Sequence, residues 1–587
     1  MLAITVSWIA ILVVFLSFGD FLISAYNKLC KRDEQYGLTD TFLLGMCAVL
    51  VPLSVSSFWL PANQYILFAF LLLSLAYWII RKSHLYHKLR QIKDNLKKLS
   101  LFHCVTFAIP ILGLMVAILW QVGVFDSLYY HQQNIRWNEE YGIVPGLGNI
   151  EHRFGFNSNY LLLSPVFGFR FLFGETVYAL QVLVLVSVMC WIIKEVITSG
   201  YEIKRIALLL VFTSYIFTFG YTLTASSTDS IPNVIAFYLI AKLLLYPETL
   251  KTKYLFLFFV PVSLLTFKIS IAPICLISLI ILISLLRQKN ISVIVSLISV
   301  SVLITGLWLA RNVIITGYLI FPLHEIDVFA VDWKIPVSIA IEEKDFIYSC
   351  GIRSFGDMTW RIKNWEWTAY AITEWFTYFS FFSAIILLPV ITLYSTVVKK
   401  YVNKTAYLIF LILALILILW YTGGPDPRFI GGVLFATIYY IIFVVLSTRE
   451  EKHFRRIGIA ALTLFTCMMG YWAISRTKNF TAMYNIQAHP KSPSVRTAYD
   501  VLIKQYPYKE SLKSMGFFVD DFKPYTFDNG SVIYISRSPQ IPLGQLFVCF
   551  ESPFPCTVRK DDKNSKYLDV SEIETRGLSL QDGFRVK

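Results

Sequence analysis

Long apolar stretches separated by short polar connections recur along most of the chain. A helix needs about 20 apolar residues, in a range of roughly 17–25, to cross the hydrocarbon core of a membrane, and this criterion predicts about 14 crossings. The predicted spans are 3–25, 40–60, 64–81, 101–122, 177–194, 203–222, 231–247, 253–267, 270–287, 291–312, 377–397, 405–421, 430–447 and 457–474. The apolar stretch 160–174 contains Arg170, so we interpret it as an interfacial or re-entrant segment.

Composition indicates the same class of protein. Of 587 residues, 56% are hydrophobic and 15% are charged, whereas soluble domains have about 45–50% apolar and about 25% charged residues. This excludes an ordinary cytosolic enzyme, a disordered protein and a fibrous repeat. We therefore expect an all-α polytopic membrane bundle.

Positive charge is concentrated in alternate connections, which favours a cytoplasmic location for these connections. The short outer connections 61–63 and 223–230 contain no Lys or Arg, and 422–429 contains only Arg428. Both termini are therefore expected outside the cytoplasm. The net charge of +14 follows from this topology, so it does not indicate nucleic-acid binding. The predicted inner cations are Lys28, Lys31, Arg32, Arg81, Lys82, Lys88, Arg90, Lys93, Lys97, Lys98, Lys194, Lys204, Arg205, Lys251, Lys253, Arg287, Lys289, Lys399, Lys400, Lys404, Arg449, Lys452, Arg455 and Arg456.

All long polar segments then fall on the outer side, at 123–159, 313–376 and 475–587. We divide the chain into three additional N-terminal transmembrane helices (1–100), a transmembrane core (101–474) and a small extracytoplasmic α/β domain (475–587). Within this domain, 496–506 is predicted to be helical, and 532–535 and 546–550 are predicted to be strands. Cys549 and Cys556 lie on the oxidising side, so we predict a disulfide, with two free thiols as the alternative.

The outer segments favour a membrane enzyme, because a site for an outer-face substrate has to be built from them. A transporter usually places its chemistry near the membrane midplane and often contains a structural repeat. The sequence has no Walker motif, no CxxC pair and no Cys/His cluster with zinc spacing.

Asp126 opens the first outer segment, in Phe125-Asp126-Ser127-Leu128-Tyr129-Tyr130-His131. If 126–141 is a surface helix, Asp126, Tyr130, Gln133 and Trp137 share one face. A carboxylate beside aromatic rings suits a general base for a sugar hydroxyl, and the alternative is an interfacial Asp that caps the helix. The segment 141–159 is either substrate-facing or an ordered loop. From these two segments we take Tyr130, His131 and Arg153 as candidate substrate-binding residues.

Four further candidates for substrate binding lie near the outer ends of predicted spans. Asp229 is either near a phosphate-binding helix N-terminus or an N-cap before Pro232. Lys268 interrupts apolar sequence and is either functional or snorkels to the interface. Arg428 suits bidentate phosphate binding, with a local pair to Asp426 as the alternative. Arg311 either contacts phosphate or anchors its span at the interface.

Several motifs resemble the glycosyltransferase-C superfamily and, more closely, an uncharacterised group of bacterial polytopic membrane proteins. The motifs are DSLYYHQQNIRW (126–137), YGIVPGLGN (141–149), FGFNS (154–158), RNVIITGYLIFP (311–322), GGPDPRF (423–429) and DGFR (582–585). The resemblance implies an integral membrane enzyme that uses a polyprenyl-phosphate sugar donor. It also implies that an acidic residue of the first large outer loop, here Asp126, is the catalytic base. Because Ser127 replaces the second acidic residue of the common pattern, a paired motif for a divalent metal is absent and the cofactor stays open.

These observations predict a bacterial inner-membrane glycosyltransferase of cell-envelope polysaccharide biosynthesis. Its partners would be membrane lipid, a polyprenyl-phosphate sugar donor and an envelope glycan, lipid or protein acceptor on the outer face. The alternatives are a polysaccharide polymerase or ligase, a transporter or flippase for a lipid-linked glycan, and a non-catalytic assembly protein.

Overall fold

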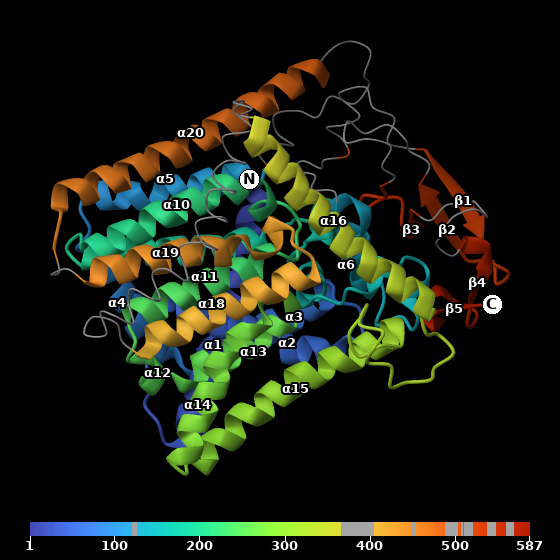
Figure 1. Cartoon of the computed structure of the whole chain (residues 1–587), viewed down its shortest axis with the longest axis horizontal. Coiled ribbons are helices and arrows are strands. Elements are labelled where there is room, and N and C mark those ends of the chain that lie inside the picture. The colour runs from blue at the N-terminus through green and yellow to red at the C-terminus, as the bar shows by residue number, and fades with distance from the viewer. Residues whose placement is uncertain are drawn as a thin grey trace.

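The computed structural model describes residues 1–119, 126–364, 404–448, 452–487, 503–505, 509, 521–536, 548–558 and 569–587. Most of these residues form helices packed side by side, and the strands gather at one end of the bundle (Figure 1). The predicted span 377–397 lies outside the described residues.

Nine helical segments of the described chain are long and apolar enough to cross a membrane. The count is ten if α3 (Gln64–Ile80) and α4 (Lys82–Lys97), which form a bent pair, are one span. Three shorter apolar helices occupy further predicted positions: α5 (Leu101–Ala117), α11 (Ser230–Leu245) and α13 (Tyr254–Leu265). The chain is thus a multi-pass helical membrane protein, as expected, although the predicted number of 14 spans is not reached in these ranges. The nine segments are α1 (Leu2–Cys30), α2 (Leu38–Ser56), α9 (Leu180–Thr198), α10 (Ile203–Leu223), η5 with α14 (Ile269–Cys275 and Leu276–Arg287), α15 (Ile291–Thr316), α18 (Lys404–Gly423), η6 with α19 (Pro427–Ile430 and Gly431–Ser447) and the first part of α20 (Arg455–Gln487).

Small residues allow α1 and α2 to approach closely. A Cβ at Gly45 would lie 1.7 Å from the carbonyl oxygen of Phe15, and one at Gly19 would lie 2.0 Å from that of Thr41. Such backbone contact is the usual way in which membrane helices pack, because lipid supplies no hydrophobic force between them.

The segment 160–174, expected to be interfacial or re-entrant, consists of short helical turns packed against the bundle. They are α7 (Asn159–Leu163), η4 (Pro165–Phe167) and α8 (Arg170–Phe173), and α7 and η4 are buried throughout. Arg170 pairs with Glu139 at 2.7 Å and with Glu551 at 3.2 Å. Its charge is therefore satisfied by protein carboxylates and not by the membrane interface.

The segments 123–159 and 313–376, which the charge pattern predicts to lie outside, contain more helix than the sequence pattern predicts. The first begins with η1 (Ser127–His131), a single π-helical turn, and α6 (Gln132–Glu140), followed by η2 (Leu147–Asn149) and η3 (His152–Gly155). The second contains the long α16 (Val337–Asn364), which Figure 1 shows running diagonally between the other helices and the strands. The short α12 (Thr249–Thr252) joins α11 to α13.

The C-terminal segment contains two small sheets. In the first, β1 (Phe522–Thr526) pairs antiparallel with β2 (Val532–Ser536), which pairs parallel with β3 (Cys556–Thr557). In the second, β4 (Ile573–Thr575) pairs antiparallel with β5 (Phe584–Val586), and the short turns η7 (Val570–Glu572) and η8 (Leu580–Asp582) flank β4 and β5. The strand predicted at 532–535 is confirmed, whereas 548–550 is not a strand. Most of the predicted helix 496–506 lies outside the described residues.

Candidate functional site

A cavity of about 470 Å³ lies where the polar segments 123–159 and 313–376 meet the ends of several helices. Six of the candidate residues line it: Asp126, Tyr130, Arg153, Asp229, Lys268 and Arg428. Its walls also contain apolar and aromatic side chains, including Trp308, Phe321, Phe346 and Trp420. Charged groups and an apolar wall therefore share one chamber.

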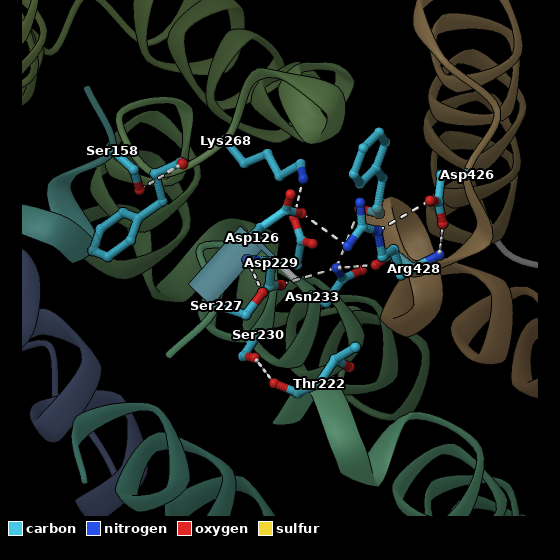
Figure 2. A network of polar contacts seen from close by, with 12 residues as sticks. Asp126, Ser158, Thr222, Ser227, Asp229, Ser230, Asn233, Lys268, Asp426 and Arg428 are labelled. Atoms are coloured by element: carbon cyan, nitrogen blue, oxygen red, sulfur yellow. Dashed lines mark hydrogen bonds and ion pairs between the residues drawn. The ribbon is translucent and has the colours of Figure 1, made fainter. Parts of the chain in front are cut away.

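Asp126 and Arg428 form the central ion pair of this cavity. Asp126 Oδ2 lies 2.8 Å from Arg428 Nη1, and Asp126 Oδ1 lies 3.7 Å from Arg153 Nη1. Figure 2 shows the carboxylate of Asp126 facing Arg428, with Lys268 on the same side. The convergence of Asp126, Lys268 and Arg428, which the topology predicts, is present in the structure.

The turn that carries Arg428 is fixed by its neighbours. Asp426 accepts hydrogen bonds from the backbone N–H and from Nε of Arg428, both at 3.0 Å. Asn233 of α11 donates to the carbonyl of Phe429 at 3.2 Å and accepts from the N–H of Gly432 at 2.9 Å. The local pair of Arg428 with Asp426 is present, and Arg428 also lines the cavity. Phosphate binding by Arg428 stays a prediction.

Lys268 is held at the break between α13 and η5. Its ammonium donates to the carboxylate of Asp229 and lies 3.9 Å from the ring centroid of Phe429. Asp229 stands at the N-terminus of α11, yet its side chain makes no capping hydrogen bond there. Its carboxylate pairs with Lys268 instead of serving as an N-cap.

A fourth acidic residue of the cavity, which the sequence pattern did not indicate, contacts Arg153. Glu343 of α16 accepts from Arg153 Nε at 3.1 Å and contacts His152 Nε2 at 2.8 Å. Its side chain is 1% exposed. Glu343 follows the buried Ile339 by one helical turn, so a carboxylate on the apolar face of an amphipathic helix was the available signal.

The charges form an alternating series across the cavity. Asp426, Arg428, Asp126, Arg153 and Glu343 each contact the next. Burial raises the pKa of the Asp126 carboxyl, but neighbouring charges, chiefly that of Arg428, lower it more, so the pKa lies below its ordinary value. Asp126 is therefore ionised at neutral pH, and its basicity is restrained by its partners.

Two candidates do not line the cavity. His131 is 2% exposed and packs against the ring of Tyr130 at 4.3 Å between centroids. Arg311 is 1% exposed and donates to Ser57 Oγ at 2.5 Å and to Asn138 Oδ1 at 2.9 Å. The expectation of a phosphate contact or an interface anchor for Arg311 is wrong. Its buried guanidinium donates hydrogen bonds that link α15 to the end of α2 and to α6 inside the protein.

The C-terminal segment is hydrogen-bonded to the residues that follow Asp126. Cys549 and Cys556 form a disulfide, with their Cα atoms 5.7 Å apart. The N–H groups of Cys549 and Phe550 both donate to the carbonyl of Leu128, at 3.2 and 3.0 Å.

Gln133 completes this attachment. Its side chain donates to the carbonyls of Phe550 at 3.0 Å and Pro553 at 2.8 Å, and accepts from the N–H of Cys556 at 3.0 Å. The predicted surface helix 126–141 is therefore not on the surface, because the disulfide loop 549–556 covers Gln133 and neighbouring residues.

A second contact joins the chain end to the VPGLGN turn. The N–H of Phe584 donates to the carbonyl of Pro145 at 2.9 Å. Gly146 has φ +64°, and a Cβ there would lie 2.1 Å from the carbonyl oxygen of Phe584. Glycine is required here both by the backbone conformation and by this close approach.

The described ranges contain no group of three or more His, Cys, Asp or Glu side chains arranged to hold a metal ion. The charged residues of the cavity are instead paired as cations and carboxylates.

Comparison with known proteins gives one match. The model of a family described as a domain of unknown function (DUF8201) covers residues 1–435. Neither the curated proteins nor the solved structures contain a significant match.

Proposed function

We propose a function from the geometry of the cavity, because the chain belongs to the DUF8201 family, which is described only as a domain of unknown function. The family model covers every charged residue of the cavity. The protein is a membrane glycosyltransferase that moves a sugar from a polyprenyl-phosphate donor to an envelope glycan, lipid or protein acceptor. The observation that carries this proposal is the pairing of Asp126 with Arg428 and of Lys268 with Asp229 in one cavity with apolar walls.

The proposed reaction is a substitution at the anomeric carbon of the donor sugar. The acceptor oxygen forms the new bond to this carbon, and the bond to the lipid phosphate breaks. Asp126 takes the acceptor proton as general base. Arg428 and Lys268 stabilise the charge that develops on the leaving phosphate. Phosphate is a good leaving group, so the reaction requires no strong general acid.

The ion pairs already present in the cavity determine the order of the proposed steps. In the described structure each of Arg428, Arg153 and Lys268 already faces a carboxylate, so a donor phosphate has to displace one of them. We propose that the phosphate takes Arg428 from Asp126. Losing that cation raises the pKa of Asp126 toward its ordinary value, so donor binding turns a restrained carboxylate into a better base.

The proposed location is a bacterial inner membrane, with the cavity and both termini outside the cytoplasm. The distribution of Lys and Arg supports this orientation. A reporter fused after Lys587 tests it: activity of a reporter that works only outside the cytoplasm is expected. Activity of a reporter that works only in the cytoplasm would overturn the orientation.

Native mass spectrometry of the purified protein tests the donor. Retained polyprenyl-phosphate sugar, lost in Arg428→Ala, is the expected result. A complete lipid-linked oligosaccharide would favour a polymerase, ligase or flippase instead. Retention of neither lipid, with no sugar transfer in reconstituted vesicles supplied with donor, would overturn the proposal.

A further inference from the structure

Helix α4 projects sideways from the bundle. It follows α3 after a bend of 91°. We take α3, which is apolar and packs against the candidate span α1, to cross the membrane, so a helix at right angles to it runs along the membrane surface. Figure 1 places α4 at the end of the bundle away from the strands, the end that the charge distribution assigns to the cytoplasm.

One face of α4 is apolar, and within the described part of the chain no residue of this helix is buried. Leu85, Leu89, Ile92 and Leu96 follow the spacing i, i+4, i+7 and i+11, which places them in one stripe. No residue of α4 is buried, and Leu89 and Leu96 are 55% and 57% exposed. An apolar stripe on an interfacial helix is typical of burial at the boundary between headgroups and acyl chains.

A buried carboxylate fixes the depth of α4. Asp20 of α1 pairs with Lys88, contacts His84 Nε2 at 3.3 Å and accepts from the hydroxyl of Tyr77 at 2.6 Å. Asp20 lies roughly 27 Å along α1 from its first residue, at 1.5 Å per residue. This length is close to the hydrocarbon thickness of about 30 Å, so α4 is held at the membrane boundary.

The opposite flank of the helix carries exposed cations. Lys82, Arg90, Lys93 and Lys97 follow the spacing i, i+8, i+11 and i+15 and form one row beside the apolar stripe. This row lies on the other side of the stripe from Lys88, which is directed to Asp20. Arg90 has an acidic neighbour, Asp94, at 4.0 Å, but both side chains are largely exposed, so this pair is weak.

We propose that α4 is a binding surface for anionic phospholipid headgroups. The apolar stripe enters the upper acyl region, and the row of cations contacts headgroup phosphates. Charge complementarity selects anionic lipid over zwitterionic lipid, because each Lys or Arg near an anionic surface adds roughly fivefold to binding. The proposal is independent of the chemistry in the cavity.

Native mass spectrometry with phosphatidylglycerol and phosphatidylcholine of matched chains tests the proposal. In Lys93→Gln/Lys97→Gln, retention of phosphatidylglycerol is expected to fall by at least about tenfold, from roughly fivefold per cation, while that of phosphatidylcholine is unchanged. The control Arg287→Gln/Lys289→Gln removes two exposed cations from the predicted inner side and should change retention far less. Equal losses in the two variants, or no loss in either, would overturn the proposal.

Hydrogen exchange of the full-length protein in nanodiscs gives a second readout. Amides of α4 are expected to exchange more slowly in phosphatidylglycerol than in phosphatidylcholine, and Lys93→Gln/Lys97→Gln should abolish the difference. Equal exchange in both lipids would contradict lipid binding and leave α4 available to a protein partner.

Discussion

The carboxylate of Asp126 lies 2.8 Å from the guanidinium of Arg428, although most of the membrane helices separate the two residues in sequence. Asp126 lies just before η1, and Arg428 lies in η6, the turn that leads into α19. Each residue also has a second partner, Arg153 for Asp126 and Asp426 for Arg428. The pair therefore joins the start of the segment 126–159 to the turn before α19 electrostatically.

This pairing predicts opposite effects of one substitution on binding and on transfer. Asp126→Asn removes the proposed base, so transfer should fall by on the order of 10²–10⁴. The same change removes one of the two carboxylates that face Arg428 and leaves only Asp426, so donor binding should be unchanged or tighter. Sugar transfer in reconstituted vesicles and donor retention by native mass spectrometry measure the two effects.

Asp332→Asn is the matched control for this experiment. Asp332 is a 43% exposed carboxylate that pairs with Arg576, and it does not line the cavity. It should leave both readouts unchanged. Full transfer activity in Asp126→Asn would reject Asp126 as the base.

Substitutions in the Lys268–Asp229 pair should affect folding stability and donor binding differently. Removing either partner leaves a largely buried charge alone, which costs on the order of 3 kcal/mol of folding free energy. Both Lys268→Met and Asp229→Asn should therefore lower the unfolding temperature, and the double variant should recover part of the loss.

Of these two residues, only Lys268 should be required for donor binding. Lys268→Met removes a phosphate partner and should weaken retention of the donor, whereas Asp229→Asn removes a competitor and should preserve it. Equal weakening by both substitutions would show that the pair acts through the fold alone.

The disulfide predicts a simple count of reactive thiols. Unfolded but unreduced protein should react at the seven free cysteines, and reduction should raise the number to nine. Mass spectrometry after alkylation gives this count directly. Reaction at nine sites before reduction would mean that Cys549 and Cys556 are both free thiols.

Topology explains why part of the site could be predicted. Lys268 and Arg428 stand out because ionic groups are costly near lipid, and span counting places them with Asp126 at one membrane face. Glu343 was missed because α16 lies in a segment interpreted as a polar loop. A helix boundary there was needed before its carboxylate could be assigned to a buried face.

Arg311 shows the opposite error. An arginine at the end of an apolar span is typical of an interfacial anchor, and sequence alone gives it no other neighbour. Its partners Ser57 and Asn138 come from two distant segments. The sequence pattern indicates that this charge is costly, but only the hydrogen bonds of Arg311 to Ser57 and Asn138 show what offsets that cost.

The hydrogen bonds of Gln133 lead us to predict that the disulfide loop is required to hold the segment after Asp126 in place. Gln133→Leu keeps the approximate size of the side chain but removes three hydrogen bonds to 550–556. Each buried backbone group left without a partner costs about 1–3 kcal/mol. The loop should therefore detach more readily, and limited proteolysis should cleave the C-terminal segment faster in this variant.

The same substitution should also reduce transfer without abolishing donor binding, because Arg428 and Lys268 stay in place while the segment bearing Asp126 is held less firmly. Gln288→Leu is the control, since the exposed Gln288 bonds only locally to Ser284 in the described structure. Faster proteolysis with unchanged transfer would mean that the loop stabilises the C-terminal segment and does not position Asp126. Unchanged proteolysis would mean that the contacts between the disulfide loop and Leu128 hold the loop without help from Gln133.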